Sequence, residues 1–539
     1  MGHLWITLFS VFFLLVGHLL HALNDPEFEH PHRGCYYTNW AQYRKYPGRF
    51  TVADVDSSLC TYIVVAFGKI ENNSLTTLEW NDEETFRKLV ALRDDSRPSL
   101  KILLSIGGWT LSNQLIAVSK TKQSRTAFAA SVVRNLRYWE LDGLDVDWEY
   151  PDAALKEQYS ALLLVLREAF EVEAKERSIP RLALAAAVHF TSDGGYDGKV
   201  LDQTLDLVNV MSYDLHGAWD REKVGHHAPL FRGPFGQVSG QSVSAVVKAW
   251  EHLGVSKNKL VVGLPMYGRG WILGNSTSRG LGAAATDPIG TSNYTGENGA
   301  WPFYEICQRV KAERATYVFD KDIQSAYAYT PEWWIGYDDR ITIAAKVKWT
   351  MTSGYGGVYV WDLAQDDFHN SCGMGHYPLL NVIRDVLNPN FNSRRLLQTT
   401  PKTTQTTLTT TAATTPELEE QRPVWVDVQE TSLRQQWTSS TTRARPLAFP
   451  LGGALTGKPF LPKPSVGKLA CDKSFCQWNG PGSFAIGRCE IKYCDCDAGN
   501  NPYSRECIGG LVYDTLSKFC NWQENVEGCP RFSPSKSEA

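Results

Sequence analysis

Three acidic residues alternate with apolar residues in one short segment, DGLDVDWEYP (142–151): Asp145, Asp147 and Glu149. Residues i and i+2 of a β-strand share a face, so these carboxyl groups would line one face about 6–7 Å apart. Carboxylates this close cannot all ionise, so at least one proton is shared and one pKa rises. A carboxylic acid that stays protonated near neutral pH can donate to a leaving oxygen. Glu149, the last of the three, is therefore the expected general acid.

An edge strand with its acids in water would show the same alternation. The rest of the chain must therefore decide between a solvated edge strand and a buried strand that carries catalytic acids. Short apolar runs rich in β-formers recur at eight places: 35–38, 61–67, 101–106, 144–148, 182–188, 207–213, 260–266 and 356–361. Most are separated by segments with helical patterning, such as 157–177. Continuous apolar strands that alternate with helices predict a parallel sheet with both faces covered.

Eight such units over about 350 residues predict an α/β fold, a (β/α)8 TIM barrel. The runner-up is an open doubly wound sheet, which the lack of a Gly-rich phosphate loop disfavours. The long gap before the last strand, about 269–337, has its own aromatic and apolar runs and predicts an inserted α+β subdomain. Acids on a barrel strand are costly unless they are paired or protonated, and catalytic residues of this fold lie at the C-terminal strand ends.

The chain has 539 residues, which is too long for one ordinary domain. An apolar run near the N-terminus predicts a signal peptide over 1–22, with an N-terminal membrane anchor as the alternative. We expect the large domain at 31–390 and a linker with a Thr-rich stalk at 391–467. Residues 468–532 would form a small disulfide-rich β module. A formal net charge of −4 gives no support for a nucleic-acid partner.

The 12 cysteines are sparse in the large domain and crowded in the tail. An even number behind a signal peptide predicts disulfides in an oxidising compartment. Zinc is the weaker alternative, because the crowded stretch contains no His and no paired CxxC sets. We expect neither a metal nor a cofactor. Glycosylation sequons at Asn72, Asn275 and Asn293 fit the same secretory route.

The segment DGLDVDWEYP resembles the DxxDxDxE signature of glycoside hydrolase family 18, the chitinases. Further family motifs occur in the expected order at strand ends: SIGG (105–108), MSYD (211–214), MYGR (266–269) and Trp361. The resemblance is strongest to secreted animal chitinases of the chitotriosidase and acidic mammalian chitinase type. It implies a secreted, extracellular endochitinase that acts as a monomer on chitin and N-acetylglucosamine oligosaccharides, away from the membrane once the signal is removed. The disulfides that it implies are Cys35–Cys60 and Cys307–Cys372.

Family 18 enzymes use a substrate group in place of an enzyme nucleophile. The resemblance implies that Glu149 protonates the glycosidic oxygen while the 2-acetamido carbonyl of the sugar attacks its own anomeric carbon. Water then opens the cyclic oxazolinium ion with retention of configuration. Asp147 would hold the acetamide N–H, and Asp145 would share a proton with Asp147 in the resting state. Tyr213 and Asp214 would hydrogen-bond the acetamide or nearby hydroxyls.

A larger set of residues matches substrate-binding positions of the family. The aromatic members are Tyr36, Trp40, Phe67, Trp80, Trp109, Tyr150, Tyr213, Tyr267 and Trp361, with Trp361 as the floor of the cleavage subsite. The other members are Glu79, Gly107, Gly108, Thr110, Met211, Ser212, Asp214 and Arg269. An aromatic residue near a barrel mouth can instead be ordinary packing, and for Trp219 the two interpretations are evenly balanced. Thr110 departs from the Asn that the family often has there, so an outer hydrogen bond could be lost.

The cysteine spacing of the tail resembles the peritrophin-type chitin-binding module, family 14 of the carbohydrate-binding modules. The cysteines that fall into this spacing are Cys489, Cys496, Cys507, Cys520 and Cys529. Either Cys471 or Cys476 would supply the first of the six, and the other could pair with Cys494. A disulfide knot that binds another protein is the alternative.

Two function classes compete with the chitinase prediction. A chitin-binding lectin would bind without cutting, and the intact Glu149, Asp147 and Tyr213 disfavour it. A structural glycoprotein of a cuticle or mucus layer would suit the Thr-rich stalk alone. It would show no turnover and no dependence on Glu149.

Overall fold

The computed structural model describes residues 26–233, 241–274, 277–388, 471–479, 482–485, 492–496, 501–506, 512–514 and 519–521. The chain divides into two compact units, Met1–Thr410 and Thr411–Ala539. The signal peptide expected at 1–22 and the linker expected at 391–467 lie outside the described residues. Among the residues that are described, no helix is both long and apolar enough to cross a membrane.

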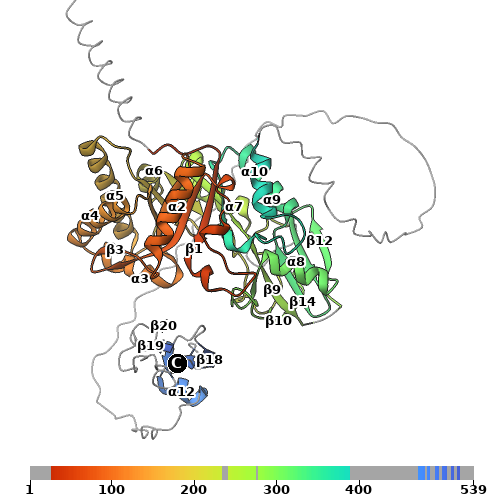
Figure 1. The fold of residues 1–539 in the computed structure, drawn as a ribbon. Helices are drawn as coiled ribbons and strands as arrows, with labels where there is room; N and C mark the ends of the chain where they lie inside the picture. Colours follow the sequence, from red (N-terminus) through yellow and green to blue (C-terminus); the bar gives the residue numbers. More distant parts are fainter. Residues whose placement is uncertain are drawn as a thin grey trace, which may run out of the picture. The chain divides into compact units, whose positions relative to one another are not determined.

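Eight parallel strands form a closed barrel in the first unit (Figure 1). They are β1 (His32–Thr38), β2 (Tyr62–Glu71), β4 (Lys101–Gly107), β5 (Gly143–Asp147), β6 (Ala183–Val188), β7 (Leu207–Val210), β8 (Leu260–Pro265) and β15 (Gly357–Trp361). The barrel closes because β1 pairs with both β2 and β15. A short strand, β3 (Ser74–Thr76), extends β2 in the antiparallel direction. The predicted TIM barrel is confirmed, and the open doubly wound sheet is excluded by this closure.

Helices pack around the outside of the barrel (Figure 1). They are α2 (Asp82–Ser96), α3 (Gly108–Ser119), α4 (Lys122–Tyr138), α5 (Lys156–Arg177), α6 (Gly198–Thr204), α7 (Val243–Leu253), α9 (Arg340–Thr352) and α10 (Pro378–Leu387). Short 3-10 turns are η1 (Asn39–Tyr43), η2 (Val52–Asp54), η3 (Ser57–Leu59), η4 (Lys257–Lys259) and η5 (Leu363–Gln365). In α5 the apolar side chains Leu162, Leu166 and Phe170 recur every fourth residue and are fully buried, which is why this segment forms a helix against the sheet.

The predicted α+β insertion is also confirmed, and it begins as soon as the seventh barrel strand ends. Its elements are β9 (Tyr267–Leu273), β10 (Ala285–Pro288), β11 (Ala300–Pro302), α8 (Phe303–Ala312), β12 (Thr316–Asp320), β13 (Ser325–Tyr329) and β14 (Trp333–Tyr337). The sheet is antiparallel, in the order β10-β9-β14-β13-β12. The disulfides Cys35–Cys60 and Cys307–Cys372 are both present, as the family resemblance implies.

The described part of the second unit is a small disulfide-bonded β module. It contains α12 (Lys473–Asn479), β16 (Gly482–Ala485), β17 (Lys492–Cys496), β18 (Pro502–Glu506), β19 (Val512–Asp514) and β20 (Phe519–Asn521). Cys476 pairs with Cys496, and Cys471 pairs with Cys494, so the structure resolves the choice that the spacing leaves open. Cys489, Cys507, Cys529 and the side chain of Cys520 lie outside what the structure describes.

Candidate active site

Asp145 is fully buried inside the barrel and is well supplied with hydrogen bonds. Its Oδ2 accepts from the hydroxyl of Tyr36 at 2.9 Å and from that of Ser105 at 2.7 Å. Its Oδ1 accepts from the amide of Asn209 at 3.5 Å. Burial raises the pKa of Asp145 to about 6, although the three donors act in the opposite direction. Asp145 is therefore held from three other strands: β1, β4 and β7.

Asp147 lies two residues along the same face of β5 and has a different environment. Its side chain is buried, and within the described structure its Oδ1 has no hydrogen-bond partner. Burial, together with the charges of Glu149 and Asp145, raises the pKa of Asp147 well above its usual range. A buried carboxyl oxygen without a partner is costly, and it can accept or donate a hydrogen bond when a ligand arrives.

Glu149 lies beyond the end of β5, which stops at Asp147, and not on the strand as the alternation predicts. Its backbone N–H donates to Oγ of Ser112, in α3, at 2.7 Å. Burial raises the pKa of Glu149 to about 7; the nearby Asp214 charge adds to this, and a hydrogen bond with Tyr150 opposes it. Glu149 is thus a carboxylic acid that keeps its proton near neutral pH, as a general acid must.

The turn after β4 brings α3 against the end of β5, and it requires glycine. Gly107 and Gly108 have φ angles of 106° and 67°, in the left-handed region. A Cβ on Gly107 would lie 2.1 Å from the carbonyl oxygen of Asp147, and one on Gly108 would lie 2.5 Å from the ring of Phe67. The missing side chains therefore allow Ser112 to reach the backbone that follows β5.

Asp214 presents a second carboxylate, which is held by an ion pair. The Arg269 guanidinium donates to it twice, at 2.8 and 2.6 Å, and the Tyr267 hydroxyl donates at 2.7 Å. His227 Nδ1 lies 3.4 Å from the same carboxylate. Burial alone would raise the pKa of Asp214, but Arg269 and His227 hold it well below its usual range. Tyr267 and Arg269 belong to β9, so the insertion sheet supplies them and not the barrel strand whose end the MYGR motif predicts.

The side chains of Asp147, Glu149 and Asp214 meet in a pocket of about 170 Å³. Its lining residues are Asp147, Glu149, Tyr150, Phe190, Met211, Tyr213, Asp214, Tyr267, Arg269, Glu297, Trp361 and Gln365. Trp361, the last residue of β15, lies with its ring centroid 5.2 Å from that of Tyr36, 6.2 Å from Phe67 and 6.3 Å from Trp40. The Tyr213 hydroxyl lies 3.1 Å from that of Tyr359. The pocket thus combines acids, hydroxyls and several aromatic rings.

Residues 32–366 of the chain match the sequence model of the family described as glycosyl hydrolases family 18. The chain belongs to glycosyl hydrolase family 18. It is 33% identical over 501 residues to chitotriosidase-1 of Mus musculus, covering 90% of this chain and 94% of that protein. It is 37% identical over 389 residues to an endochitinase of Brugia malayi, and this match covers 69% of this chain and 76% of that protein.

A solved structure extends the comparison to the fold. The structure of human YKL-39, described as a pseudo-chitinase with retained chitooligosaccharide binding properties, matches with a TM-score of 0.64 and 34% identity. The match covers 66% of this chain and 99% of that one. The family and these relatives make this chain a glycoside hydrolase.

Other predicted binding residues of this family 18 chain are not among the residues that line the pocket. Trp80 and Trp109 are 83% and 78% exposed, and Thr110 is exposed beside Trp109. Glu79 accepts a hydrogen bond from the Tyr43 hydroxyl at 2.7 Å. Ser212 is buried and donates to the backbone oxygen of Gly263 at 2.9 Å, so its hydroxyl is already used. Trp219 is exposed, and its ring lies 5.3 Å from the Arg269 guanidinium carbon.

Several residues of the site carry no signal in the sequence. Phe190, Glu297 and Gln365 line the pocket, and Ser112 and Asn209 hold the acidic strand, yet each is an isolated residue with no local pattern. Glu297 accepts a hydrogen bond from Arg269 at 3.0 Å, and both of these insertion residues line the pocket. Only the three-dimensional fold brings these residues to the acids.

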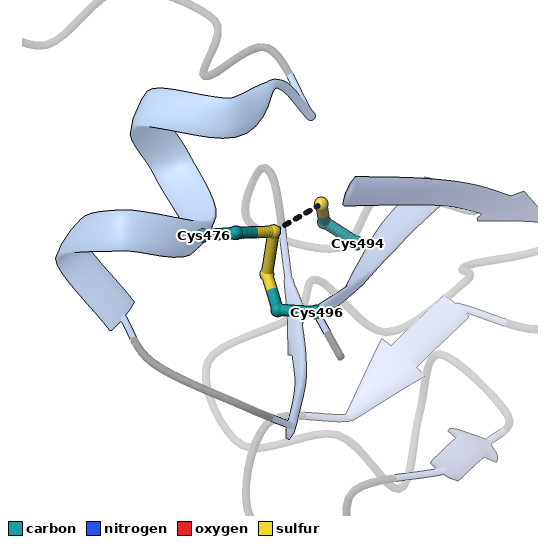
Figure 2. Close-up of side chains that lie close together, drawn as sticks. All are labelled: Cys476, Cys494 and Cys496. Atoms are coloured by element: carbon teal, nitrogen blue, oxygen red, sulfur yellow. Dashed lines mark hydrogen bonds between the residues drawn. A yellow bond between two sulfur atoms is a disulfide. The ribbon is translucent and has the colours of Figure 1, made fainter. Parts of the chain in front are cut away.

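Among the described residues of the tail, one group of side chains has the composition of a metal site. The sulfur atoms of Cys476, Cys494 and Cys496 lie within 4.8 Å of one another, and those of Cys476 and Cys494 are 4.0 Å apart (Figure 2). Cys476 is bonded to Cys496, and Cys494 is bonded to Cys471. Since a metal requires thiolates, these disulfides leave no ligand in this group.

Proposed function

We propose that this family 18 member is a secreted endochitinase that hydrolyses β-1,4 N-acetylglucosamine linkages with retention, and that Glu149 is its proton donor. One observation carries the proposal. Asp145 and Asp147 are buried and Glu149 is half-buried, Asp147 and Glu149 line a pocket with Trp361 in its wall, and desolvation raises the pKa of all three carboxyl groups. Protonated acids beside an aromatic surface suit the cleavage of a sugar linkage.

In the first step, protonated Glu149 gives its proton to the glycosidic oxygen as the bond to the anomeric carbon breaks. The carbonyl oxygen of the 2-acetamido group on the same sugar attacks the anomeric carbon from the other side, and an oxazolinium ion forms. Asp147 accepts a hydrogen bond from the acetamide N–H through a carboxylate oxygen, and its negative charge offsets the developing positive charge. The proton that Asp147 held passes toward Asp145.

In the second step, the Glu149 carboxylate removes a proton from water. The oxygen of that water bonds to the anomeric carbon, and the acetamide carbonyl leaves, so the acetamido group is restored. Two inversions at one carbon give net retention, and Glu149 regains its proton for the next cycle. No metal or cofactor takes part in this sequence.

The other residues of the pocket orient the sugar. Trp361 offers a ring on which the apolar face of a pyranose can stack. The hydroxyl of Tyr213 can donate to the acetamide oxygen, and Asp214, kept ionised by Arg269, can accept from a sugar hydroxyl. Because the mechanism uses the acetamide, cellulose should be inert.

We extend the proposal to the whole chain. Residues 1–22 would be a signal peptide, 31–390 the catalytic barrel, 391–467 a linker and 468–532 a chitin-binding module on a secreted monomer. The module's pairing of Cys476 with Cys496 supports a compact six-cysteine unit with one additional disulfide. A tethered module would raise the local concentration of the barrel at an insoluble polymer.

The second candidate is chitin binding without cleavage. It is favoured by the likeness to human YKL-39, a pseudo-chitinase that retains chitooligosaccharide binding. The carboxyl group of Glu149 and its raised pKa favour hydrolysis here.

Product analysis on chitin oligosaccharides tests the proposal. Chromatography that resolves anomers should show cleavage with the β-anomer formed first, and Glu149→Gln should bind the oligosaccharide without cutting it. Initial release of the α-anomer would contradict the substrate-assisted route. Binding without cleavage by the folded wild-type chain would favour the second candidate.

A further inference from the structure

A second pocket lies on the insertion, outside the site described above. It has a volume of about 420 Å³ and is lined by Thr277, Arg279, Gly280, Tyr327 and Tyr329. It shares none of its lining residues with the catalytic pocket. The proposed mechanism uses none of them.

The floor of this pocket is a pair of neighbouring tyrosine rings. Tyr327 and Tyr329 are two residues apart on β13 and so lie on one face of the sheet, while Ala326 and Ala328 are fully buried on the other. The ring centroids of the two tyrosines are 6.1 Å apart, with 28° between the planes. Both rings are half-buried, which leaves them partly open to solvent.

The tyrosines rest on a rigid support. The Tyr327 ring stacks on that of Trp334 at 5.0 Å and 25°, and Trp334 in turn contacts Trp271 at 5.8 Å. Trp334 and Trp271 are both fully buried in a small second core of the insertion. This support fixes Tyr327, the inner ring of the pair, in one orientation, so a ligand would not need to order it.

The sheet register connects this pocket to the catalytic one. Arg269, Gly336 and Tyr327 are paired in one row across β9, β14 and β13. Residues paired across a sheet point to the same face, so Tyr327 is on the same face as Arg269, which binds Asp214. Gly336 contributes no side chain, and the Trp334 ring and His226 lie over it and separate the two pockets.

The polar rim adds to the aromatic floor. The Arg279 guanidinium carbon lies 5.8 Å from the centre of the Tyr329 ring, and Thr277 contributes a hydroxyl to the lining. Flat rings accept the apolar face of a pyranose, and a guanidinium and hydroxyls at the edge can bind its hydroxyl and acetamide groups. A peptide or a lipid would not need this combination of a flat floor and a polar rim.

We propose that this pocket is a second saccharide site that binds N-acetylglucosamine units of the polymer outside the catalytic pocket. The inference rests on the proposed chitinase function for the identity of the sugar. The site would hold the polymer on the sheet face that also carries Arg269 and would raise the local substrate concentration without taking part in cleavage. It therefore affects insoluble chitin and leaves short soluble oligosaccharides unaffected.

The test compares Tyr329→Ala with the wild-type side chain in the full-length protein. All proteins carry Asn275→Gln, because the sequon that includes Thr277 could otherwise place the chain's own glycan there. Two quantities are measured: the dissociation constant for insoluble chitin, by depletion, and kcat/KM on soluble chitotetraose. Tyr329→Ala should weaken chitin binding about fivefold, the loss of one aromatic contact, while kcat/KM on chitotetraose stays within about twofold.

Tyr138→Ala is the matched control, because Tyr138 is an exposed tyrosine at the end of α4. It should change neither quantity. The double variant Tyr327→Ala/Tyr329→Ala should weaken chitin binding further, with its melting temperature reported beside it. Unchanged chitin binding by Tyr329→Ala, or an equal loss in Tyr138→Ala, would overturn the second site.

The chitinase function and the second saccharide site can be contradicted independently of each other. A folded wild-type chain that binds chitin but does not cut chitotetraose contradicts the chitinase function, while a loss of chitin binding in Tyr329→Ala still supports the second site. A wild-type chain that cuts chitotetraose, with chitin binding insensitive to Tyr329, contradicts the second site alone.

Discussion

Asp145 and Asp147 lie on the same face of β5, yet only Asp145 is anchored. The Asp145 carboxylate accepts from Tyr36, Ser105 and Asn209, whereas Asp147 Oδ1 has no partner among the described residues. The fixed carboxyl can receive a proton and hold it, and the unfixed one can turn toward the substrate. This difference supports the proposed acetamide contact of Asp147.

We first predict the effect of Asp147→Asn. The amide keeps the shape of the side chain but loses the charge that offsets the oxazolinium ion, so kcat on chitotetraose should fall about 10²–10³-fold with a small change in KM. Steady-state kinetics check this. Asp145→Asn is the control and should cost less, because Asp145 acts through its neighbour. A kcat within a few-fold of wild type in Asp147→Asn would contradict the assignment.

The pKa of Glu149 predicts the alkaline limb of the pH profile. Burial raises this pKa to about 7, so the proton that the first step needs is present below pH 7 and lost above it. A plot of kcat/KM against pH should therefore fall above about pH 7, by roughly tenfold per pH unit. A profile that stays flat to pH 9, with chitin oligosaccharides as substrate, would show that Glu149 is not the donor.

The same raised pKa predicts a pH-dependent stability of Glu149→Gln. A folded-state pKa above the unfolded value of 4.5 stabilises the fold below pH 4.5, and this stability is lost as the pH rises through about 7. The ionised carboxylate is then buried at a cost that glutamine avoids. Glu149→Gln should melt at a higher temperature than wild type at pH 8 and show a smaller difference at pH 5. A larger gain at pH 5 than at pH 8 would reverse the sign and contradict this account.

How far the sequence predicts this site depends on whether a residue belongs to a local pattern. The strands are continuous apolar runs, so their number and the barrel could be predicted, and the acids of β5 stand out by their alternation. Glu149 falls outside the strand because its backbone bonds to Ser112, a contact between segments 37 residues apart. Such contacts depend on the closed barrel and leave no periodic signal in the chain.

The Asp214–Arg269 ion pair predicts the acid limb of the plot of kcat/KM against pH. Arg269 keeps the pKa of Asp214 below its usual range, so Asp214 stays ionised in acid. Arg269→Met should raise that pKa, protonate Asp214 at higher pH and make kcat/KM fall below about pH 5 where wild type is still active. The comparison of pH profiles checks this, and Arg134→Met is the control, because Arg134 is exposed on α4 and lines neither pocket. Identical acid limbs in Arg269→Met and wild type would contradict it.

The last prediction concerns a buried ion pair between α9, which contains Lys346, and Asp338, the residue that follows β14. Lys346 Nζ and Asp338 Oδ2 are 2.5 Å apart, and the two side chains are 0% and 2% exposed. Lys346→Met leaves the Asp338 charge buried without its partner and should lower the free energy of unfolding by about 3 kcal/mol. Asp338→Leu in the same chain removes that charge as well, so the double variant should recover most of the loss, because two apolar side chains can replace a buried pair. Urea unfolding followed by tryptophan fluorescence measures both variants. A double variant that is less stable than Lys346→Met would show that the pair itself, rather than the avoidance of a lone buried charge, stabilises the fold.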